Sequence, residues 1–186
     1  AELDENQGIH ATWVHDPSSA FTDEIVYWNT QLSTPSVITT TNPVYDYSKL
    51  IVNQNGTAFV AWANNLSVQE DLFYWNSSTQ TVKNISDPVD GAGNLSGEFQ
   101  WEIDDTGDVH LLWTEEDCSS CVAKTWLFYH RVNDGSTVRL INPMGNGGDV
   151  STTILRVSSP AKAHVAWTER ISEVTGETMI LYWDSD

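Results

Sequence analysis

Basic residues are scarce in this chain of 186 residues: 8 lysines and arginines stand against 26 aspartates and glutamates, for a formal net charge of −18. Such a charge argues against electrostatic binding to nucleic acid phosphates and against docking on an anionic membrane. Long hydrophobic runs are also missing, because no segment approaches the ~18 apolar residues of a membrane helix. We therefore expect no nucleic acid partner and no membrane insertion.

Cysteine is limited to Cys118 and Cys121, in a polar Cys-Ser-Ser-Cys segment. One pair offers too few ligands for a zinc site, and a thioredoxin-type site needs a helix start in a βαβ setting that this sequence lacks. We interpret the pair as a small loop disulfide formed in an oxidising compartment. A redox or metal-binding role is the alternative.

Two further features are absent. The chain begins at Ala1 without an initiator methionine or a basic-then-apolar signal segment, so we expect a processed mature protein or a piece of a longer one. No segment shows a helical hydrophobic period, which leaves strands and turns as the expected elements.

Aromatic residues, in contrast, are abundant and periodic. A strand-like run ending in tryptophan occurs four times, at Trp13, Trp62, Trp113 and Trp167, with steps of 49, 51 and 54 residues. Each is followed by a second run that ends in Tyr-Trp or Tyr-His, at residues 25–28, 72–75, 127–130 and 180–183. A period of this length is typical of tandem β-blades.

Alternating apolar residues and turn signals such as Asn55-Gly56 divide the repeats into fourteen strands. The predicted strands are 8–13, 24–28, 35–39, 48–54, 57–63, 71–75, 81–85, 99–103, 109–113, 125–131, 137–141, 153–157, 163–167 and 179–183. Both faces of the central strands are apolar, as expected for sheets packed between neighbours.

The predicted fold is all-β: one β-propeller-type domain, 1–186, of about four antiparallel four-stranded blades. The repeats span approximately 1–44, 45–95, 96–148 and 149–186. The terminal blades are expected to be incomplete, because residues 1–7 are too acidic for an inner strand and the last repeat has no fourth strand. Open edges near 1–8 and 182–186 predict self-association, with strands of another copy or of missing chain completing the blades.

The third repeat resembles sialidase-like (BNR/Asp-box-type) β-propeller repeats. The resemblance is carried by Asp104-x-x-Gly107-x-Val109-His110-x-x-Trp113, by Phe128-Tyr129-His130-Arg131, and by Asn133-Asp134-Gly135-Ser136-Thr137. It extends loosely over all four repeats. The full Asp-box is absent everywhere, and the segment 134–137 is its remnant.

The resemblance implies an arginine triad that grips a carboxylate, a Tyr–Glu nucleophile pair and an acidic aspartate. The four arginines of this chain, Arg131, Arg139, Arg156 and Arg170, lie at non-equivalent places and outside any recognisable motif. We therefore expect no catalytic residues and a protein that is not an enzyme. A degenerate sialidase-like glycoside hydrolase is the minority alternative.

His10, His110 and His164 each precede a repeat tryptophan by three residues, and Phe59 takes that place in the second repeat. A convergent metal or acid–base cluster is one interpretation, and a packing position common to each blade is the preferred one. Asp104, Asp105 and Asp108 are weak candidates for calcium, since they supply carboxylates on one turn without a full calcium-loop motif. Structural calcium is the one cofactor considered.

Five glycosylation sequons begin at Asn55, Asn65, Asn76, Asn84 and Asn94, mostly at predicted turns. They indicate a secreted, acidic glycoprotein that is extracellular or attached to the cell surface. Trp101 and Trp126 lie outside the repeat consensus and are the candidate ligand-contact aromatics.

The function we predict is a non-catalytic propeller module for adhesion or assembly, with a self-assembling filament subunit as its sharper form. A glycan-binding, lectin-like propeller with a carbohydrate partner is the alternative.

Overall fold

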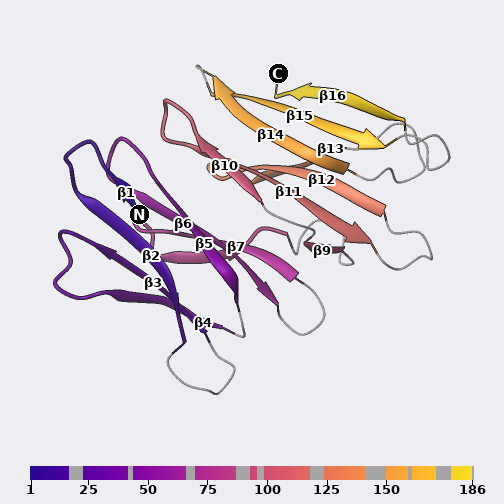
Figure 1. The fold of residues 1–186 in the computed structure, drawn as a ribbon. Coiled ribbons are helices and arrows are strands. Elements are labelled where there is room, and N and C mark those ends of the chain that lie inside the picture. The colour runs from indigo at the N-terminus through magenta and orange to yellow at the C-terminus, as the bar shows by residue number, and fades with distance from the viewer. Residues whose placement is uncertain are drawn as a thin grey trace. The chain divides into compact units, whose positions relative to one another are not determined.

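The computed structural model of the chain consists of β-strands and their connections (Figure 1). It describes residues 1–16, 23–41, 44–65, 70–86, 93–95, 99–117, 124–140, 150–158, 161–170 and 177–185. Within these ranges there are sixteen strands in four antiparallel sheets, which confirms the predicted all-β, propeller-type array. None of the described residues belongs to a helix long and apolar enough to cross a membrane.

The first two repeats form sheets of four strands each, which follow one another in chain order. Sheet A contains β1 (Glu2–Leu3), β2 (Ile9–His15), β3 (Asp23–Asn29) and β4 (Ser36–Thr41). Sheet B contains β5 (Val44–Val52), β6 (Ala58–Asn65), β7 (Glu70–Asn76) and β8 (Thr81–Asn84).

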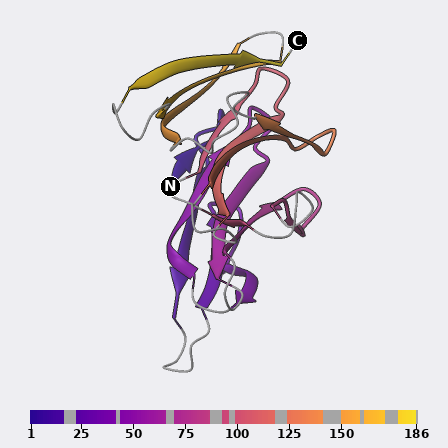
Figure 2. The ribbon, with the colours of Figure 1, turned by 90° about the vertical axis from the view of Figure 1, so that its right-hand side faces the viewer.

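The last two repeats form sheets C and D. Sheet C contains β10 (Gln100–Ile103), β11 (Val109–Asp117), β12 (Lys124–Arg131) and β13 (Ser136–Leu140), and the short β9 (Gly93–Leu95) pairs with the far end of β11. Sheet D contains β14 (Val150–Ser158), β15 (Lys162–Arg170) and β16 (Thr178–Asp184). Figure 2 shows β16, in yellow, along the border of sheet D.

Two strands differ from the sequence expectation. Residues 1–7 were expected to be too acidic for an inner strand, but Glu2 and Leu3 pair with His10 and Ile9, so the first blade has four strands. The acidic side chain does not oppose this pairing, because Glu2 is exposed and the ladder uses backbone groups only. The strand β9 was not predicted either. Sheet D has three strands in the described part of the chain, as expected.

A shared turn joins the first two strands of sheets A, B and C. Asp4, Asn53 and Asp104 each accept backbone N–H groups two and four residues ahead, on one side-chain oxygen. The residue three positions ahead has a left-handed backbone: Gly56 at φ +75° and Gly107 at φ +84°. Asx side chains favour such turns, and glycine adopts a positive φ without steric cost.

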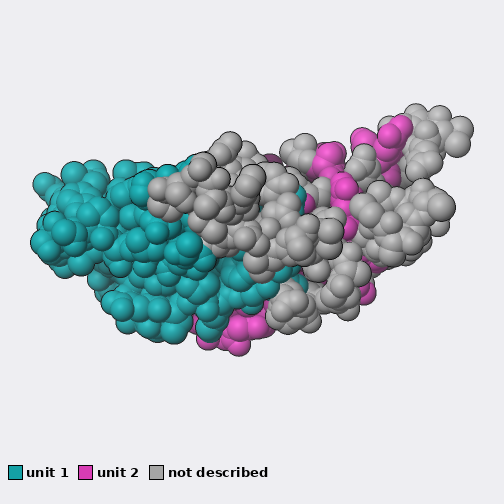
Figure 3. Space-filling view, turned by 90° about the horizontal axis from the view of Figure 1, so that it is seen from below, with its two compact units in different colours: residues 1–91 teal, residues 92–186 magenta. Residues whose placement is uncertain are grey.

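By contacts, the chain divides into two compact units, residues 1–91 and 92–186 (Figure 3). The core of the first unit joins sheets A and B through Ile25, Tyr27, Ala58, Val60, Trp62 and Trp75. The core of the second joins sheets C and D through Leu112, Leu127, Tyr129, Leu140, Leu155, Ala163, Val165 and Trp167. In both units, the first sheet contributes the face that carries its strand-three tyrosine, Tyr27 or Tyr129. The second sheet contributes the face that carries its strand-two tryptophan, Trp62 or Trp167.

Candidate functional site

A row of hydrogen-bonded side chains links a turn to two strands in sheet A. Asp4, in the turn before β2, places Oδ2 3.2 Å from Nε2 of His10. The other ring nitrogen, Nδ1, lies 2.7 Å from the hydroxyl of Tyr27, to which the Asn29 amide donates at 3.0 Å. Every donor finds an acceptor when His10 is neutral with its proton on Nε2.

The same row recurs in sheet C. His110, fully buried, places Nε2 3.1 Å from Oδ2 of Asp104 and Nδ1 2.6 Å from the hydroxyl of Tyr129. Burial raises the pKa of Tyr129 to about 12. Burial also pushes the pKa of Asp104 up, but hydrogen bonds from Thr106, His110 and the turn backbone outweigh it and bring the pKa to about 2. At neutral pH the tyrosine is therefore protonated and the aspartate ionised.

Sheets B and D carry variants of this row. In sheet D, Oγ of Ser158 lies 2.8 Å from Nε2 of His164, and Nδ1 lies 2.6 Å from the Tyr182 hydroxyl. In sheet B the corresponding places hold Asn53 and the buried Phe59. His10, His110 and His164 are thus each hydrogen-bonded to a tyrosine of their own sheet. This arrangement is compatible with the interpretation of these histidines as a packing position common to the blades.

Sequence reasoning identified the histidines but missed their partners. The signal was present, because an acidic or polar residue stands six places before each histidine position and a tyrosine stands in every strand three. Only the register of the strands brings the three groups together, since His110 and Tyr129 are 19 residues apart.

Sheet C adds an ion pair to its row. The carboxylate of Asp108, fully buried, accepts from Nε of Arg131 at 2.6 Å and from the backbone N–H groups of Val109 and Asn133. The hydrogen bond to Asp108 raises the pKa of Arg131. Arg131, whose Nη1 also lies 3.8 Å from Oδ2 of Asp134, is therefore engaged within its own blade. Residues 134–137, which resemble an Asp-box, span the end of the turn after β12 and the first two residues of β13, with Gly135 at φ +69°.

The calcium candidates are arranged differently from the prediction. Ligand atoms of Asp104, Asp108 and His110 lie within 4.8 Å of one another, while Asp105 is exposed. The two buried carboxylates already accept several hydrogen bonds each, and calcium prefers six to eight oxygen ligands. Calcium at this turn stays a prediction, and binding there would require those hydrogen bonds to be given up.

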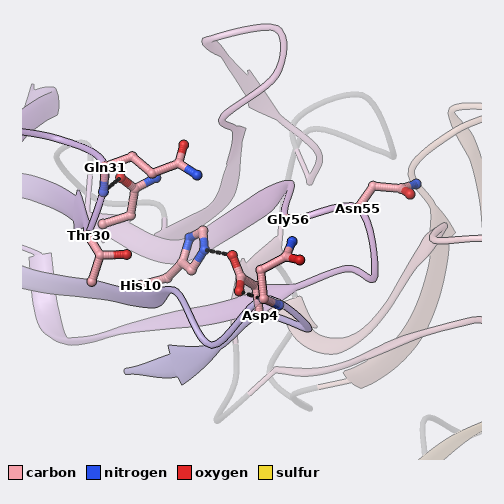
Figure 4. A pocket seen from close by; sticks show the side chains of 8 residues that line it. Asp4, His10, Thr30, Gln31, Asn55 and Gly56 are labelled. Atoms are coloured by element: carbon pink, nitrogen blue, oxygen red, sulfur yellow. Dashed lines mark hydrogen bonds and ion pairs between the residues drawn. The ribbon is translucent and has the colours of Figure 1, made fainter.

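A polar pocket of about 120 Å³ opens at the turn end of sheets A and B (Figure 4). It is lined by Asp4, Asn6, His10, Asn29, Thr30, Gln31, Asn55 and Gly56. Asp4 and His10 form its floor and are bonded to each other, as the dashed line in Figure 4 marks. The exposed side chains of Asn6, Gln31 and Asn55 belong to its rim.

One face of sheet D is apolar and open. This surface, here called the Tyr182 face, contains Ile154, Ile180 and Tyr182, which are 47%, 80% and 60% exposed. Strand register places Tyr182 opposite Ala166 and Ala166 opposite Ile154, so they form one row across the sheet. At the corresponding positions of sheets A and C, Ile25 and Tyr27 are buried against sheet B, and Leu127 and Tyr129 against sheet D.

Sheet A also has an open apolar face, on the side that carries its strand-two tryptophan. This surface, the Trp13 face, contains Leu3, Ile9, Trp13 and the half-buried Trp28. Trp13 is 38% exposed, whereas Trp62 and Trp167 at the same place in sheets B and D are 1% and 7% exposed. The difference follows from packing, because Trp62 and Trp167 belong to the two inter-sheet cores and Trp13 does not.

The predicted ligand-contact aromatics are both half-buried. Trp126, on β12, has the guanidinium of Arg139 over its ring at 4.6 Å from the centroid. Trp101, on β10, meets the ring of Phe99 edge-on, with centroids 6.2 Å apart. Neither tryptophan lines the polar pocket at the turn end of sheets A and B.

The sequons lie in different settings. Asn55 is exposed in the β5–β6 turn, and Asn76 ends β7, where its Oδ1 accepts from the Ser78 backbone. The Asn84 amide donates to Asp71 at 3.1 Å. Asn65 ends β6 and Asn94 lies in β9. The predicted disulfide, Cys118–Cys121, falls outside the described residues.

A scan against models of protein families finds no match for this chain, and a search of curated proteins finds no relative. Among solved structures it is similar to the α-L-arabinofuranosidase Arb93A from Fusarium graminearum, solved with an iminosugar inhibitor. The identity is 7% and the TM-score 0.53, over 95% of this chain and 59% of that one.

An ulvan lyase of polysaccharide lyase family PL25 is also similar, with 10% identity and a TM-score of 0.52, over 98% of this chain and 54% of that one. The chain thus spans little more than half the length of these two proteins. They support the propeller-type fold, and identities this low show the fold alone. The narrower resemblance to sialidase-like repeats stays a prediction.

Proposed function

We propose that this chain is a non-catalytic, extracellular assembly module that associates through the apolar Tyr182 face of sheet D. One observation carries the proposal: Ile180 and Tyr182 are 80% and 60% exposed, although the same repeat positions are buried wherever another sheet lies against them. The strand-three pattern forms a buried packing surface in sheets A and C, and the same pattern is exposed in sheet D. Contiguous exposed apolar surface of this kind marks an interaction site.

Burial of this face would favour association. Complete burial of a large apolar side chain stabilises by roughly 1.5–3 kcal/mol, and this face offers two aliphatic side chains and one tyrosine. Tyrosine suits the role, because its hydroxyl already has a partner in His164 and can be covered without desolvation of an unpaired group.

Further features support the non-catalytic and extracellular parts of the proposal. The histidine and tyrosine groups that acid–base chemistry would use are bonded within their own blades, as His110 is to Tyr129. The exposed sequon residue Asn55 is accessible to a glycosylating enzyme. Turnover of fluorogenic sialosides by the purified chain, lost on a substitution in the Asp4–His10 pocket, would show that the glycosidase alternative is right instead.

The association is tested by measuring mass against protein concentration with light scattering and sedimentation. We expect mass to rise with concentration, and the paired substitution Ile180→Asp with Tyr182→Ser to weaken association at least tenfold. Salt should strengthen association, because copies with a net charge of −18 repel one another.

The matched control is Val138→Asp, which places the same charge on β13 at a valine that is 39% exposed and outside both open faces. It should leave the mass curve unchanged. A wild-type chain that stays monomeric at every concentration and salt, or equal weakening by the control, contradicts the proposal.

A further inference from the structure

We infer that the Tyr182 face docks on the Trp13 face of a second copy, so that sheet D of one molecule packs on sheet A of the next, with Tyr182 seated on Trp28. This inference rests on the proposed function and names its partner. It predicts a head-to-tail contact between two different surfaces, which is a heterologous contact.

The evidence is an inter-sheet contact that occurs twice with the same geometry. Tyr27 of sheet A meets Trp75 of sheet B with ring centroids 5.0 Å apart and planes tilted by 52°. Tyr129 of sheet C meets Trp183 of sheet D at the same 5.0 Å and 52°. In each unit, the strand-three tyrosine of one sheet packs on the strand-three tryptophan of the following sheet.

Strand register extends this rule to the two open faces. Tyr182 stands where Tyr27 and Tyr129 stand, opposite the strand-two residue that directly precedes the repeat tryptophan. Trp28 stands where Trp75 and Trp183 stand, as the residue that follows this tyrosine in strand three. The tyrosine of sheet D and the tryptophan of sheet A are therefore the two halves of a third contact of the same type.

The neighbouring positions are complementary in the same way. Ile25 packs in the first core with Val60 and Trp62. Its counterpart Ile180 would accordingly meet Ala11 and Trp13 of the second copy, at the same places in strand two. Leu3, opposite Ile9, takes the place that Val52 holds beside that core.

The Trp28 ring is held in position for such a contact. Its Nε1 donates to the carbonyl oxygen of Leu32 at 3.0 Å, so the polar edge of the indole has a partner within the same sheet. The ring can then be covered by an apolar or aromatic group without leaving a buried N–H unsatisfied.

Two variants, each with one open face changed, test the pairing. The first carries Ile180→Asp and Tyr182→Ser, and the second carries Trp13→Asp and Trp28→Ser. We expect each alone to be monomeric, and an equimolar mixture to form a 1:1 dimer and nothing larger, because the mixture holds one intact face of each kind. The mixed dimer also shows that both variants are folded.

The outcomes separate this inference from the proposed function. If the second variant associates as the wild-type chain does while the first does not, the Tyr182 face binds something other than sheet A, and only the inference fails. A mixture that stays monomeric also overturns the inference. A wild-type chain without self-association overturns both.

Discussion

Nδ1 of His110 lies 2.6 Å from the hydroxyl oxygen of Tyr129, and both side chains are buried. The imidazole joins the strand-three tyrosine to the carboxylate of Asp104, so it connects the first turn of the blade to its third strand. A row of this kind contributes to stability because each member satisfies the next, and removing one leaves buried polar atoms without partners.

The first prediction concerns His110→Phe, which introduces the residue that the second repeat carries at Phe59. We expect a loss of about 1–3 kcal/mol in the free energy of unfolding, because a carboxylate and a hydroxyl lose their partner. Adding Asp104→Asn should recover part of it, since Asn53 caps the equivalent turn as a neutral amide. Urea unfolding measures both variants, and a single variant as stable as the wild type contradicts the argument.

The second prediction concerns acid stability. The pKa of Asp104 is lowered from 3.8 to about 2 in the folded protein, so its contribution to stability is complete above pH 4 and is lost as the pH falls toward 2. The contribution amounts to about 2 kcal/mol. Asp104→Asn should remove this part of the pH dependence between pH 4 and 2. Unfolding measured across that range in both proteins provides the check, and an unchanged slope argues against it.

The third prediction concerns Glu169, which is fully buried in β15. Burial raises its pKa, and the indole of Trp167 offsets only part of this effect. Because the protonated carboxyl is favoured in the folded protein, Glu169 contributes to folding stability fully below about pH 4.5, its ordinary pKa. This contribution is lost as the pH rises through the folded-state pKa. Glu169→Gln should therefore stabilise the protein at pH 7, by about 1 kcal/mol, and make little difference at pH 4.

Glu115, two residues after Trp113, is the matched control. It accepts a hydrogen bond from the indole of that tryptophan at 2.7 Å, whereas neither carboxylate oxygen of Glu169 accepts one of ordinary geometry from the described residues. Glu115→Gln is expected to destabilise at pH 7, in the direction opposite to Glu169→Gln. Thermal unfolding of the two variants at both pH values would refute the idea if their shifts had the same sign.

The fourth prediction concerns backbone conformation. Ala161 and Gln7 have φ of +53° and +62°, at the turn position where Gly56 and Gly107 stand in the other repeats. A residue with a Cβ is disfavoured there by about 1–2 kcal/mol per residue. Ala161→Gly and Gln7→Gly should each stabilise by about 0.5–1 kcal/mol, and the reverse change Gly107→Ala should destabilise. Melting temperatures of the three variants test this directly.

The fifth prediction concerns modification. In a host that glycosylates asparagine, Asn55 is expected to carry a glycan, because it is exposed in a turn. Asn84 is expected to remain unmodified, because its amide nitrogen donates to Asp71. Peptide mass spectrometry measures both occupancies, and Asn55→Gln is the control for the first. Occupied Asn84 with an unoccupied Asn55 contradicts the prediction.

Much of the fold could be predicted from local pattern. Strand alternation and turn signals such as Asn55-Gly56 act through the nearest neighbours in the chain, so the sequence reveals them. The exact start of that turn was wrong, because Asn53 was placed in the predicted strand 48–54 and instead caps the turn after β5. The strand β1 could not be predicted, because two exposed residues carry no apolar pattern and are held only by the backbone of β2. The residues of the Asp–His–Tyr rows are regularly spaced in the sequence, but whether their side chains meet depends on which strands pair.

Two nearly identical segments separate the contributions of sequence and tertiary structure. The sequence alone makes Ile25-Val-Tyr-Trp28 and Ile180-Leu-Tyr-Trp183 third strands of their blades, because each alternates side chains and follows the tryptophan-ending run of its repeat. Only the tertiary structure decides that Tyr27 is 3% exposed and Tyr182 60%. The physical reason is that burial belongs to a pair of surfaces: sheet B covers the first tyrosine, and the described part of this chain places no sheet over the second.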